Sequence, residues 1–227
     1  MREATMDRRI RKTKQQLRQS LTTLLKQKRV QDITVRELAE LADINRGTFY
    51  LHYRDVFDLL NQIEEELLGE LESVLEKYQP GSILSNTVQI FKDVYELVQK
   101  NSEIVGILMG DHGEWNFVNR LNQLLRAKCQ RDWSEHFRAE NPELFDTYYA
   151  FIISGCMGLV QYWLEYGMKE TPGELAELTG QMVMNGMKWL EEPPAAASPR
   201  LSAGAPPPAS PSPTGRPQEN IASHIQD

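Results

Sequence analysis

The chain has 227 residues, of which 41% are hydrophobic and 25% charged, with a formal net charge of −7. This composition is ordinary for a globular protein, and the length permits one or two domains with a sizeable core. The two cysteines, Cys129 and Cys156, stand far from any CxxC motif, which favours core packing in a reducing compartment over metal or redox chemistry. No secretory signal is expected, because no apolar stretch follows the basic N-terminus.

The longest apolar run predicts a buried helix rather than a membrane span. It extends from Tyr148 to Leu164 and is interrupted by Ser154 and Gln161. A transmembrane helix needs about 20 predominantly apolar residues. We therefore expect a cytoplasmic protein without a membrane partner.

Charge is divided unevenly along the chain. Residues 1–60 hold 13 Lys and Arg against 8 Asp and Glu, whereas the remaining residues hold 12 against 24. A local positive field attracts a polyanion even when the total charge is negative. A basic run at residues 8–14 precedes the first hydrophobic helix face, and it is either a solvated helix start or an arm that touches DNA.

The segment 34–53, TVRELAELADINRGTFYLHY, is typical of two short helices joined by a tight turn. Thr34 and Glu37 have the spacing of a capping box, which predicts that the first helix begins at residue 35. Asn45 can cap a second helix, and Phe49 is the inward residue of that helix. Such a pair predicts a helix-turn-helix whose second helix reads DNA.

The chemistry of the second helix suits a duplex groove. Arg46 can pair in bidentate fashion with guanine, and Gly47 removes bulk where the backbone approaches DNA. Hydroxyl and ring N–H groups nearby suit phosphate oxygens. The candidate DNA-binding residues are Thr34, Arg36, Asn45, Arg46, Gly47, Thr48, Phe49, Tyr50, His52 and Tyr53. The alternative is a tight corner in an all-helical protein, with the aromatic residues serving as packing.

The stretch LRQSLTTLLKQKRVQDITVRELAELADINRGTFYLHYRDVFDLL resembles the DNA-binding domain of the TetR family of bacterial regulators. INRGTFYLHYRD is especially similar to the branch of the dihydroxyacetone kinase operon regulator. The resemblance implies phosphate contacts from Thr34, Tyr50 and His52, and base contacts from Asn45, Arg46 and Thr48. One position departs from the pattern, because Val56 stands where the family often has a phosphate-binding lysine. Only Arg54 is placed to supply that contact.

Prolines mark the boundaries of the remaining helices. Nine of the 12 prolines lie between residues 193 and 217, a composition that cannot build a core, so the folded part should end near Glu192. We expect an all-α protein of about nine helices, at residues 8–28, 35–42, 45–51, 55–78, 82–100, 102–109, 115–139, 142–168 and 173–191. The expected domains are 1–54 for DNA binding, 55–192 for ligand binding and dimerisation, and 193–227 as a disordered tail.

The last two of these helices predict a homodimer surface, since both carry apolar stripes. Double-stranded DNA that is read in two half-sites also requires two DNA-binding domains. We call this domain, residues 1–54 of each copy, the head. A small apolar effector is a further expected partner, in a pocket lined by Trp115, Phe117, Trp133, Phe137, Tyr149 and Trp163. Ordinary core packing is the alternative for each of these aromatic residues. The expected activity is repression, with activation or co-activation through a partner protein as the alternative.

An enzyme is the competing hypothesis for residues 111–114, Asp-His-Gly-Glu, which gather titratable groups in a predicted loop. These groups could act as acid, base or metal ligands. No second cluster at recognisable spacing and no Gly-rich phosphate loop accompanies them. We therefore expect no catalytic residue, no metal and no cofactor. A helical interaction module with an inactive DNA-binding head is a third hypothesis.

Overall fold

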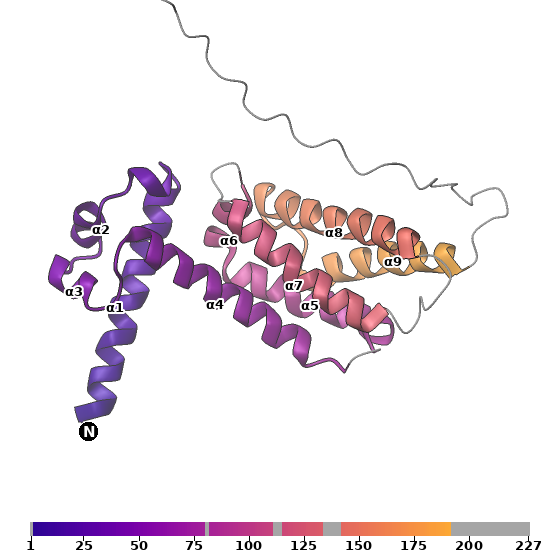
Figure 1. The fold of residues 1–227 in the computed structure, drawn as a ribbon, viewed down its shortest axis with the longest axis horizontal. Coiled ribbons are helices and arrows are strands. Elements are labelled where there is room, and N and C mark those ends of the chain that lie inside the picture. The colour runs from indigo at the N-terminus through magenta and orange to yellow at the C-terminus, as the bar shows by residue number, and fades with distance from the viewer. Residues whose placement is uncertain (1, 80–81, 111–114, 134–141, 192–227) are drawn as a thin grey trace, which may run out of the picture. The chain divides into compact units, whose positions relative to one another are not determined.

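The computed structural model describes residues 2–79, 82–110, 115–133 and 142–191, and this part of the chain is helical without any strand. It holds nine α-helices and one short 3-10 helix, so the all-α class predicted from the sequence is confirmed (Figure 1). In chain order the elements are α1 (Arg2–Leu25), η1 (Val30–Asp32), α2 (Val35–Leu41), α3 (Arg46–Tyr50), α4 (Val56–Glu76), α5 (Ile83–Lys100), α6 (Ser102–Met109), α7 (Trp115–Trp133), α8 (Pro142–Glu165) and α9 (Pro172–Glu191). The predicted tail at 193–227 lies outside the described residues.

Side-chain caps fix the beginnings of α2, α4 and α9. Thr34 Oγ1 accepts a hydrogen bond from the backbone N–H of Glu37 at 3.3 Å, and Asp55 caps α4 in the same way at 2.8 Å. At α9 the capping box is complete, because Glu174 also accepts from the backbone N–H of Thr171 at 2.8 Å. Each cap satisfies a backbone donor that the helix itself cannot pair. The start positions predicted from these residues are therefore set by local hydrogen bonds.

Five helices differ from the predicted bounds by one or two residues at an end, and α1 and α8 differ by three or more. α1 begins at Arg2 rather than at residue 8, so the basic run 8–14 is helical. α8 ends at Glu165 rather than at residue 168, because Gly167 and Met168 have φ values of 84° and 51°. A left-handed residue cannot continue a right-handed helix. The end predicted for α7, residues 134–139, lies outside the described residues.

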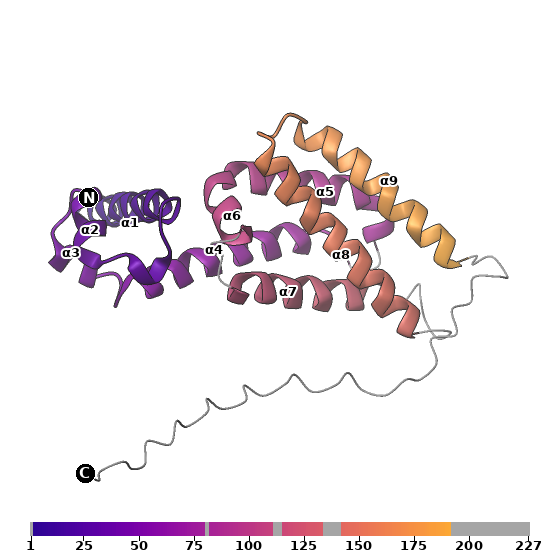
Figure 2. The same ribbon diagram turned by 90° about the horizontal axis from the view of Figure 1, so that it is seen from above.

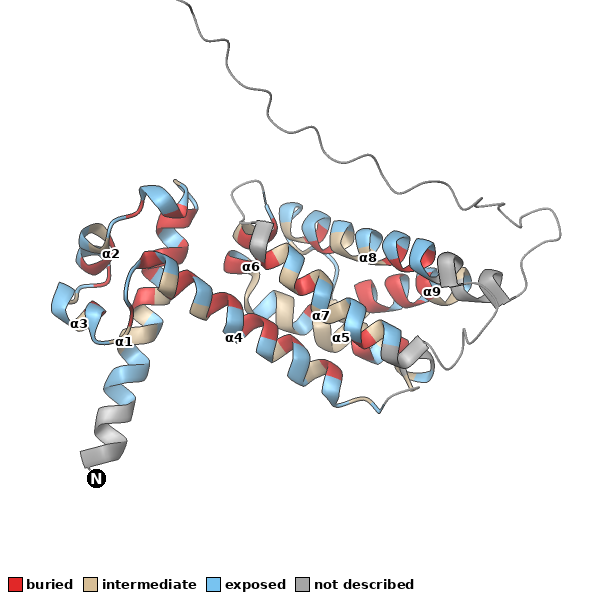
Figure 3. Ribbon diagram, viewed as in Figure 1, coloured by how far each residue is buried: buried red, intermediate tan, exposed pale blue. Residues whose placement is uncertain are grey.

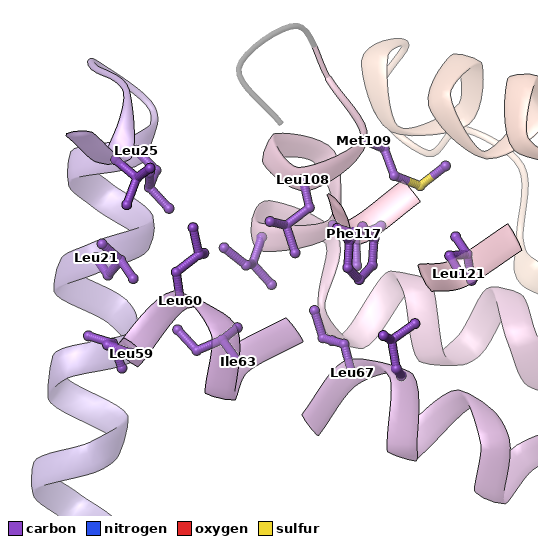
Figure 4. Packing of buried hydrophobic residues seen from close by; sticks show 14 of the residues in the cluster. Leu21, Leu25, Leu59, Leu60, Ile63, Leu67, Leu108, Met109, Phe117 and Leu121 are labelled. Carbon is purple, nitrogen blue, oxygen red and sulfur yellow. The ribbon is translucent and has the colours of Figure 1, made fainter. Parts of the chain in front are cut away.

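One hydrophobic core runs from α1 through α4 into the later helices. Figure 3 shows a continuous buried stripe along α4. In Figure 4 leucines of α1 and α4 meet on one side, and side chains of α6 and α7 continue the cluster on the other. The residues labelled there are Leu21, Leu25, Leu59, Leu60, Ile63, Leu67, Leu108, Met109, Phe117 and Leu121. α4 thus packs against α1 on one side and against α6 and α7 on the other.

Polar contacts join α1 to the helices that follow α4. The Arg18 guanidinium donates to Glu66 on α4 at 3.1 Å and to Asn101, between α5 and α6, at 3.0 Å. Lys26 pairs with Glu103 on α6 at 3.0 Å, although both side chains are largely exposed. Exposed ion pairs contribute little stability, whereas the half-buried Arg18 holds two partners in fixed positions.

α9 packs closely along α5, and α8 lies beside it (Figure 2). The Tyr95 and Thr179 hydroxyls form a buried hydrogen bond of 2.8 Å between α5 and α9. A Cβ atom placed on Gly180 would lie 2.9 Å from Val88 Cγ2, so only glycine permits this approach. One face of α9 is therefore used inside the chain, and only its opposite face is exposed.

Candidate DNA-binding surface and internal cavity

The turn between α2 and α3 is a Schellman motif. The N–H of Ile44 donates to the carbonyl of Ala39 at 3.0 Å, and the N–H of Asp43 donates to Glu40 at 3.3 Å. Asp43 adopts a φ of 52°, a left-handed conformation that aspartate tolerates better than most residues. α2 therefore stops after Leu41, and the chain turns sharply into α3.

α3 is held in place on one side by an aromatic anchor. Phe49 is fully buried. Its ring centroid lies 5.5 Å from that of Tyr50, in an edge-on arrangement, and 5.7 Å from that of Tyr53. Tyr53 is also buried, and the Lys14 ammonium of α1 lies 5.9 Å from its ring centroid. Burial, together with the carboxylates of Glu66 and Asp58, raises the pKa of Tyr53 to about 12.

Two of the ten candidate DNA contacts are buried in the structure. Phe49 and Tyr53 lie beneath the surface, at 0% and 5% exposure, because their rings fill the space between α3 and the helices behind it. They position α3 and do not present their rings to a ligand. Of the other eight candidates, the following six are exposed: Thr34, Arg36, Asn45, Arg46, Gly47 and Tyr50. The remaining two, Thr48 and His52, are half-buried.

Several exposed candidates already have partners within the head. Asn45 Oδ1 caps α3 by accepting the N–H of Gly47 at 2.8 Å, which leaves the amide nitrogen of Asn45 as its outward donor. Arg36 pairs with Glu40 at 2.9 Å, one helical turn away. Arg46 makes no side-chain hydrogen bond or ion pair with the residues that the structure describes, and it stands exposed at the start of α3. Its guanidinium is the strongest outward donor on the reading helix.

The start of α4 differs from the family pattern in its chemistry. Val56 is buried and packs into the core, so it offers nothing to a phosphate. The Arg54 side chain is 86% exposed and its guanidinium lies 3.3 Å from Asp58. The backbone N–H of Arg54, aided by that guanidinium, lowers the pKa of Asp58. Arg54 is the cation nearest to this position in the sequence.

An apolar cavity of about 200 Å³ lies among the later helices. α4 contributes Leu67, Leu71 and Leu75, and α5 contributes a further row of aliphatic and aromatic side chains. α6, α7, α8 and Val183 of α9 complete the wall. Lys128 is the charged residue among those that line it, and it is largely buried. The cavity suits an apolar molecule, because it offers contact area but few hydrogen-bonding groups.

Phe117 is the predicted pocket residue that lines this cavity. Tyr149 and Trp163 are buried outside it, where their polar groups donate to the backbone carbonyls of Asn122 at 3.1 Å and Glu170 at 2.9 Å. The side chains of the other three, Trp115, Trp133 and Phe137, lie outside the described residues. The wall is mainly aliphatic, and the leucine repeat of α4 was the sequence signal that could have indicated it.

Both α8 and α9 carry exposed apolar side chains. Phe151 is 74% exposed, and Tyr162 on the same helix and Tyr166, directly after its end at Glu165, are each more than half exposed. Gly155 and Gly158 lie between them, and a Cβ atom on either would meet nothing within 4 Å. Leu178 and Met182 are the exposed apolar residues of α9. An apolar face of this extent is typical of a protein interface.

The enzyme hypothesis rests on residues 111–114, which lie outside the residues that the structure describes. Where side chains are described, no group of three His, Cys, Asp or Glu residues is arranged to hold a metal ion. None of the described helices combines the length and apolar character that crossing a membrane requires.

The chain is similar to known transcriptional regulators, both in its C-terminal region and over most of its length. Residues 85–185 match a TetR C-terminal family described as "Transcriptional regulator C-terminal region". The chain is 38% identical over 188 residues to the uncharacterized HTH-type transcriptional regulator YxbF of Bacillus subtilis (strain 168), a match that covers 77% of this chain and 46% of that protein. The chain therefore spans about half the length of this relative.

Solved structures share the fold. A TetR transcriptional regulator from Streptococcus agalactiae 2603V has a TM-score of 0.57 and 23% identity, over 80% of this chain and 98% of that one. FadR from Bacillus subtilis has a TM-score of 0.56 and 12% identity, over 76% and 98%. The dihydroxyacetone kinase operon activator DhaS has a TM-score of 0.54 and 15% identity, over 78% and 96%. DhaS is thus one similar fold among several, and its branch is not singled out. Residues 85–185 thus match the C-terminal region of TetR-family transcriptional regulators, and the fold is shared with solved structures of that family.

Proposed function

We propose that the chain binds a palindromic DNA operator as a homodimer and represses transcription there. The observation that carries this proposal is the geometry of α3, which is fixed from behind by Phe49 while Arg46, Gly47 and Tyr50 face outward. A helix held in this way presents its side chains to a major groove at little entropic cost. Bound at a promoter, such a dimer would block transcription by occupancy alone.

The exposed face of α8 and α9 is the proposed dimer interface. Phe151 and Tyr162 supply apolar area, and Gly155 and Gly158 leave room for a helix of the second copy. The same surface on both subunits forms a two-fold interface, and two-fold symmetry in the protein matches a palindrome in the DNA.

A small apolar effector in the cavity is the proposed release signal. α4 follows directly after the DNA-binding head and lines the cavity with Leu67, Leu71 and Leu75. A ligand that displaces these leucines would tilt α4 and change the spacing of the two heads. FadR of Bacillus subtilis, solved with stearoyl-CoA, supports the idea that this fold accepts an apolar chain.

We propose further that the chain acts by binding and not by catalysis, in the cytoplasm, where a bacterial operator lies. The relatives support this, because they are named as transcriptional regulators. Activation or co-activation through a partner protein is the second candidate for the direction of control. It is favoured by DhaS, which is named as an operon activator.

Selection of bound sequences from random duplex DNA tests the main proposal. We expect an inverted repeat from the wild-type chain, and a dimeric mass by light scattering at micromolar concentration. The double variant Arg46→Ala/Tyr50→Ala keeps the fold, since both side chains are exposed, and should recover no motif. A monomeric mass together with the absence of any palindrome would contradict the proposal. A reporter gene placed behind the recovered operator then distinguishes repression from activation.

The effector proposal has its own test. The apolar fluorophore N-phenyl-1-naphthylamine should brighten on binding the wild-type chain, and Cys156→Phe should prevent this because Cys156 lines the cavity. Cys156→Ser is the matched control, since it leaves the volume unchanged. Equal binding by the phenylalanine variant would place the probe elsewhere and contradict the cavity as its site.

A further inference from the structure

The outward face of α3 can be located from the burial of one residue. Leu51, the C-cap of α3, keeps helical dihedrals with φ −71° and ψ −20°, so the helical rotation extends from Arg46 through Leu51. Successive residues of an α-helix are rotated by about 100°. Gly47 and Leu51 are each two residues from Phe49, so both point away from that buried ring. Thr48 and Tyr50 flank this outward line on either side.

Exposure follows the same geometry. Phe49 is 0% exposed, Tyr50 59% and Leu51 80%, which makes Leu51 the most exposed of the large hydrophobic residues that the structure describes. Gly47, on the same line, has no side chain, and a Cβ atom there would meet only Asn45 Oδ1 at 3.3 Å. The part of α3 that projects furthest outward therefore carries one apolar side chain and no hydrogen-bonding group.

We propose that Leu51 is a specificity-determining residue that recognises a thymine by contact with its 5-methyl group. This inference rests on the proposed function, because it requires that α3 enters a major groove. The thymine methyl is the apolar feature that the major-groove edges of the four base pairs present. At any other base, Leu51 would cover a polar edge without replacing the hydrogen bonds to water, and such burial is costly. An isolated exposed leucine is common on protein surfaces, but this one occupies the centre of the reading face.

Removal of single methyl groups from the operator tests this proposal. In the operator recovered by selection, each symmetric pair of thymines is replaced in turn by deoxyuridine, which lacks only the 5-methyl group. Burying one methyl group corresponds to about a fourfold change in affinity, or about fifteenfold for both half-sites. We expect one pair of positions to show this loss with the wild-type chain, measured by fluorescence anisotropy at fixed salt.

The variant Leu51→Ala should weaken binding to the thymine operator and should abolish the effect of deoxyuridine at that one pair. Leu41→Ala is the matched control, because Leu41 is a half-exposed leucine on α2 and should change neither result. The melting temperature of Leu51→Ala should remain that of the wild type, since the side chain is 80% exposed.

The outcomes distinguish a failure of the Leu51 contact from a failure of DNA binding by α3. A deoxyuridine loss that persists in Leu51→Ala, or no loss at any thymine, overturns the role of Leu51 and leaves the proposed function intact. If Leu51→Ala lost a similar amount of affinity for every duplex, Leu51 would contact the sugar-phosphate backbone, and this result would also overturn its role in recognising thymine. If selection recovers no DNA at all, the proposed function fails, and the inference falls with it.

Discussion

The reading head and the internal cavity are built in opposite ways. In the head, short-range hydrogen bonds place α3: Asp43 closes one helix, Asn45 caps the next, and Phe49 anchors it. The cavity has no such local cause, because its wall is assembled from six helices between Leu67 and Val183. A site fixed by neighbours in sequence holds its geometry wherever the segment folds, whereas a site made by distant helices changes when any of them moves. That contrast suits a rigid reader and an adjustable sensor.

α4 and Arg18 connect these two regions. α4 begins at the head and lines the cavity, and the core around it is continuous from α1 to α7. Arg18 ties α1 to Glu66 of α4 and to Asn101 at the junction of α5 and α6. If a ligand displaces the cavity wall as proposed, we expect the displacement to reach the head through these packed side chains and through the Arg18 guanidinium.

The largest expected effect tests whether local hydrogen bonds alone can place α3. Phe49→Ala should lower the free energy of unfolding by about 3 to 5 kcal/mol, because it leaves a cavity beneath the reading helix. DNA binding should be lost at temperatures where the later helices remain folded. Urea unfolding followed by circular dichroism measures the first effect, and anisotropy with labelled DNA measures the second.

Phe57→Ala is the control for that substitution, because Phe57 is a partly exposed phenylalanine in the first turn of α4. It should change the free energy of unfolding by less than about 0.5 kcal/mol. If Phe49→Ala instead left DNA affinity unchanged, the caps of α2 and α3 would suffice, and the aromatic anchor would have no part in reading.

The second effect concerns a surface that belongs to neither region. Gly158→Trp should weaken self-association by about 2 to 3 kcal/mol, because the indole would occupy the space proposed for a helix of the second copy. Analytical ultracentrifugation over a concentration series measures the change. Gly69→Trp is the matched control, since Gly69 on α4 also faces open space. Equal weakening by both variants would show that Gly158 is not at the interface.

The same contrast explains what the sequence could predict. The starts of α2, α3 and α4 follow from Thr34, Asn45 and Asp55, because a cap acts within three residues. The six aromatic residues of the predicted pocket were not enough to indicate the cavity wall. Tyr149 and Trp163, for example, lie outside it and donate hydrogen bonds to backbone carbonyls elsewhere. Which side chains contact one another across several helices depends on packing between segments far apart in the chain, and such packing cannot be predicted from any short segment.

A smaller effect separates base reading from the placement of the head. Arg46→Ala should cost about 1 to 3 kcal/mol on the selected operator and little on unrelated DNA, because a guanidinium contact to a base discriminates between bases. Selection repeated with the variant should show relaxed preference at one symmetric pair of positions. Arg36→Ala is the control, because Arg36 is exposed but paired with Glu40, and it should leave the motif unchanged. An unaltered motif for Arg46→Ala would remove Arg46 from the bases.

The smallest effect isolates one hydroxyl group. Tyr50→Phe keeps the ring and its edge-on contact with Phe49 at 5.5 Å, so the position of α3 should not change. If the hydroxyl donates to a phosphate, as the family resemblance implies, its loss should weaken binding to all duplexes alike, by about 0.5 to 1.5 kcal/mol. Phosphates carry no sequence information, and the selected motif should therefore remain the same. Tyr166→Phe is the control, since Tyr166 is about equally exposed but lies just after α8, and it should leave DNA affinity unchanged. A motif that shifted with Tyr50→Phe would mean that Tyr50 meets a base, and the outward line of α3 would then have to be rotated towards Tyr50 and away from Leu51.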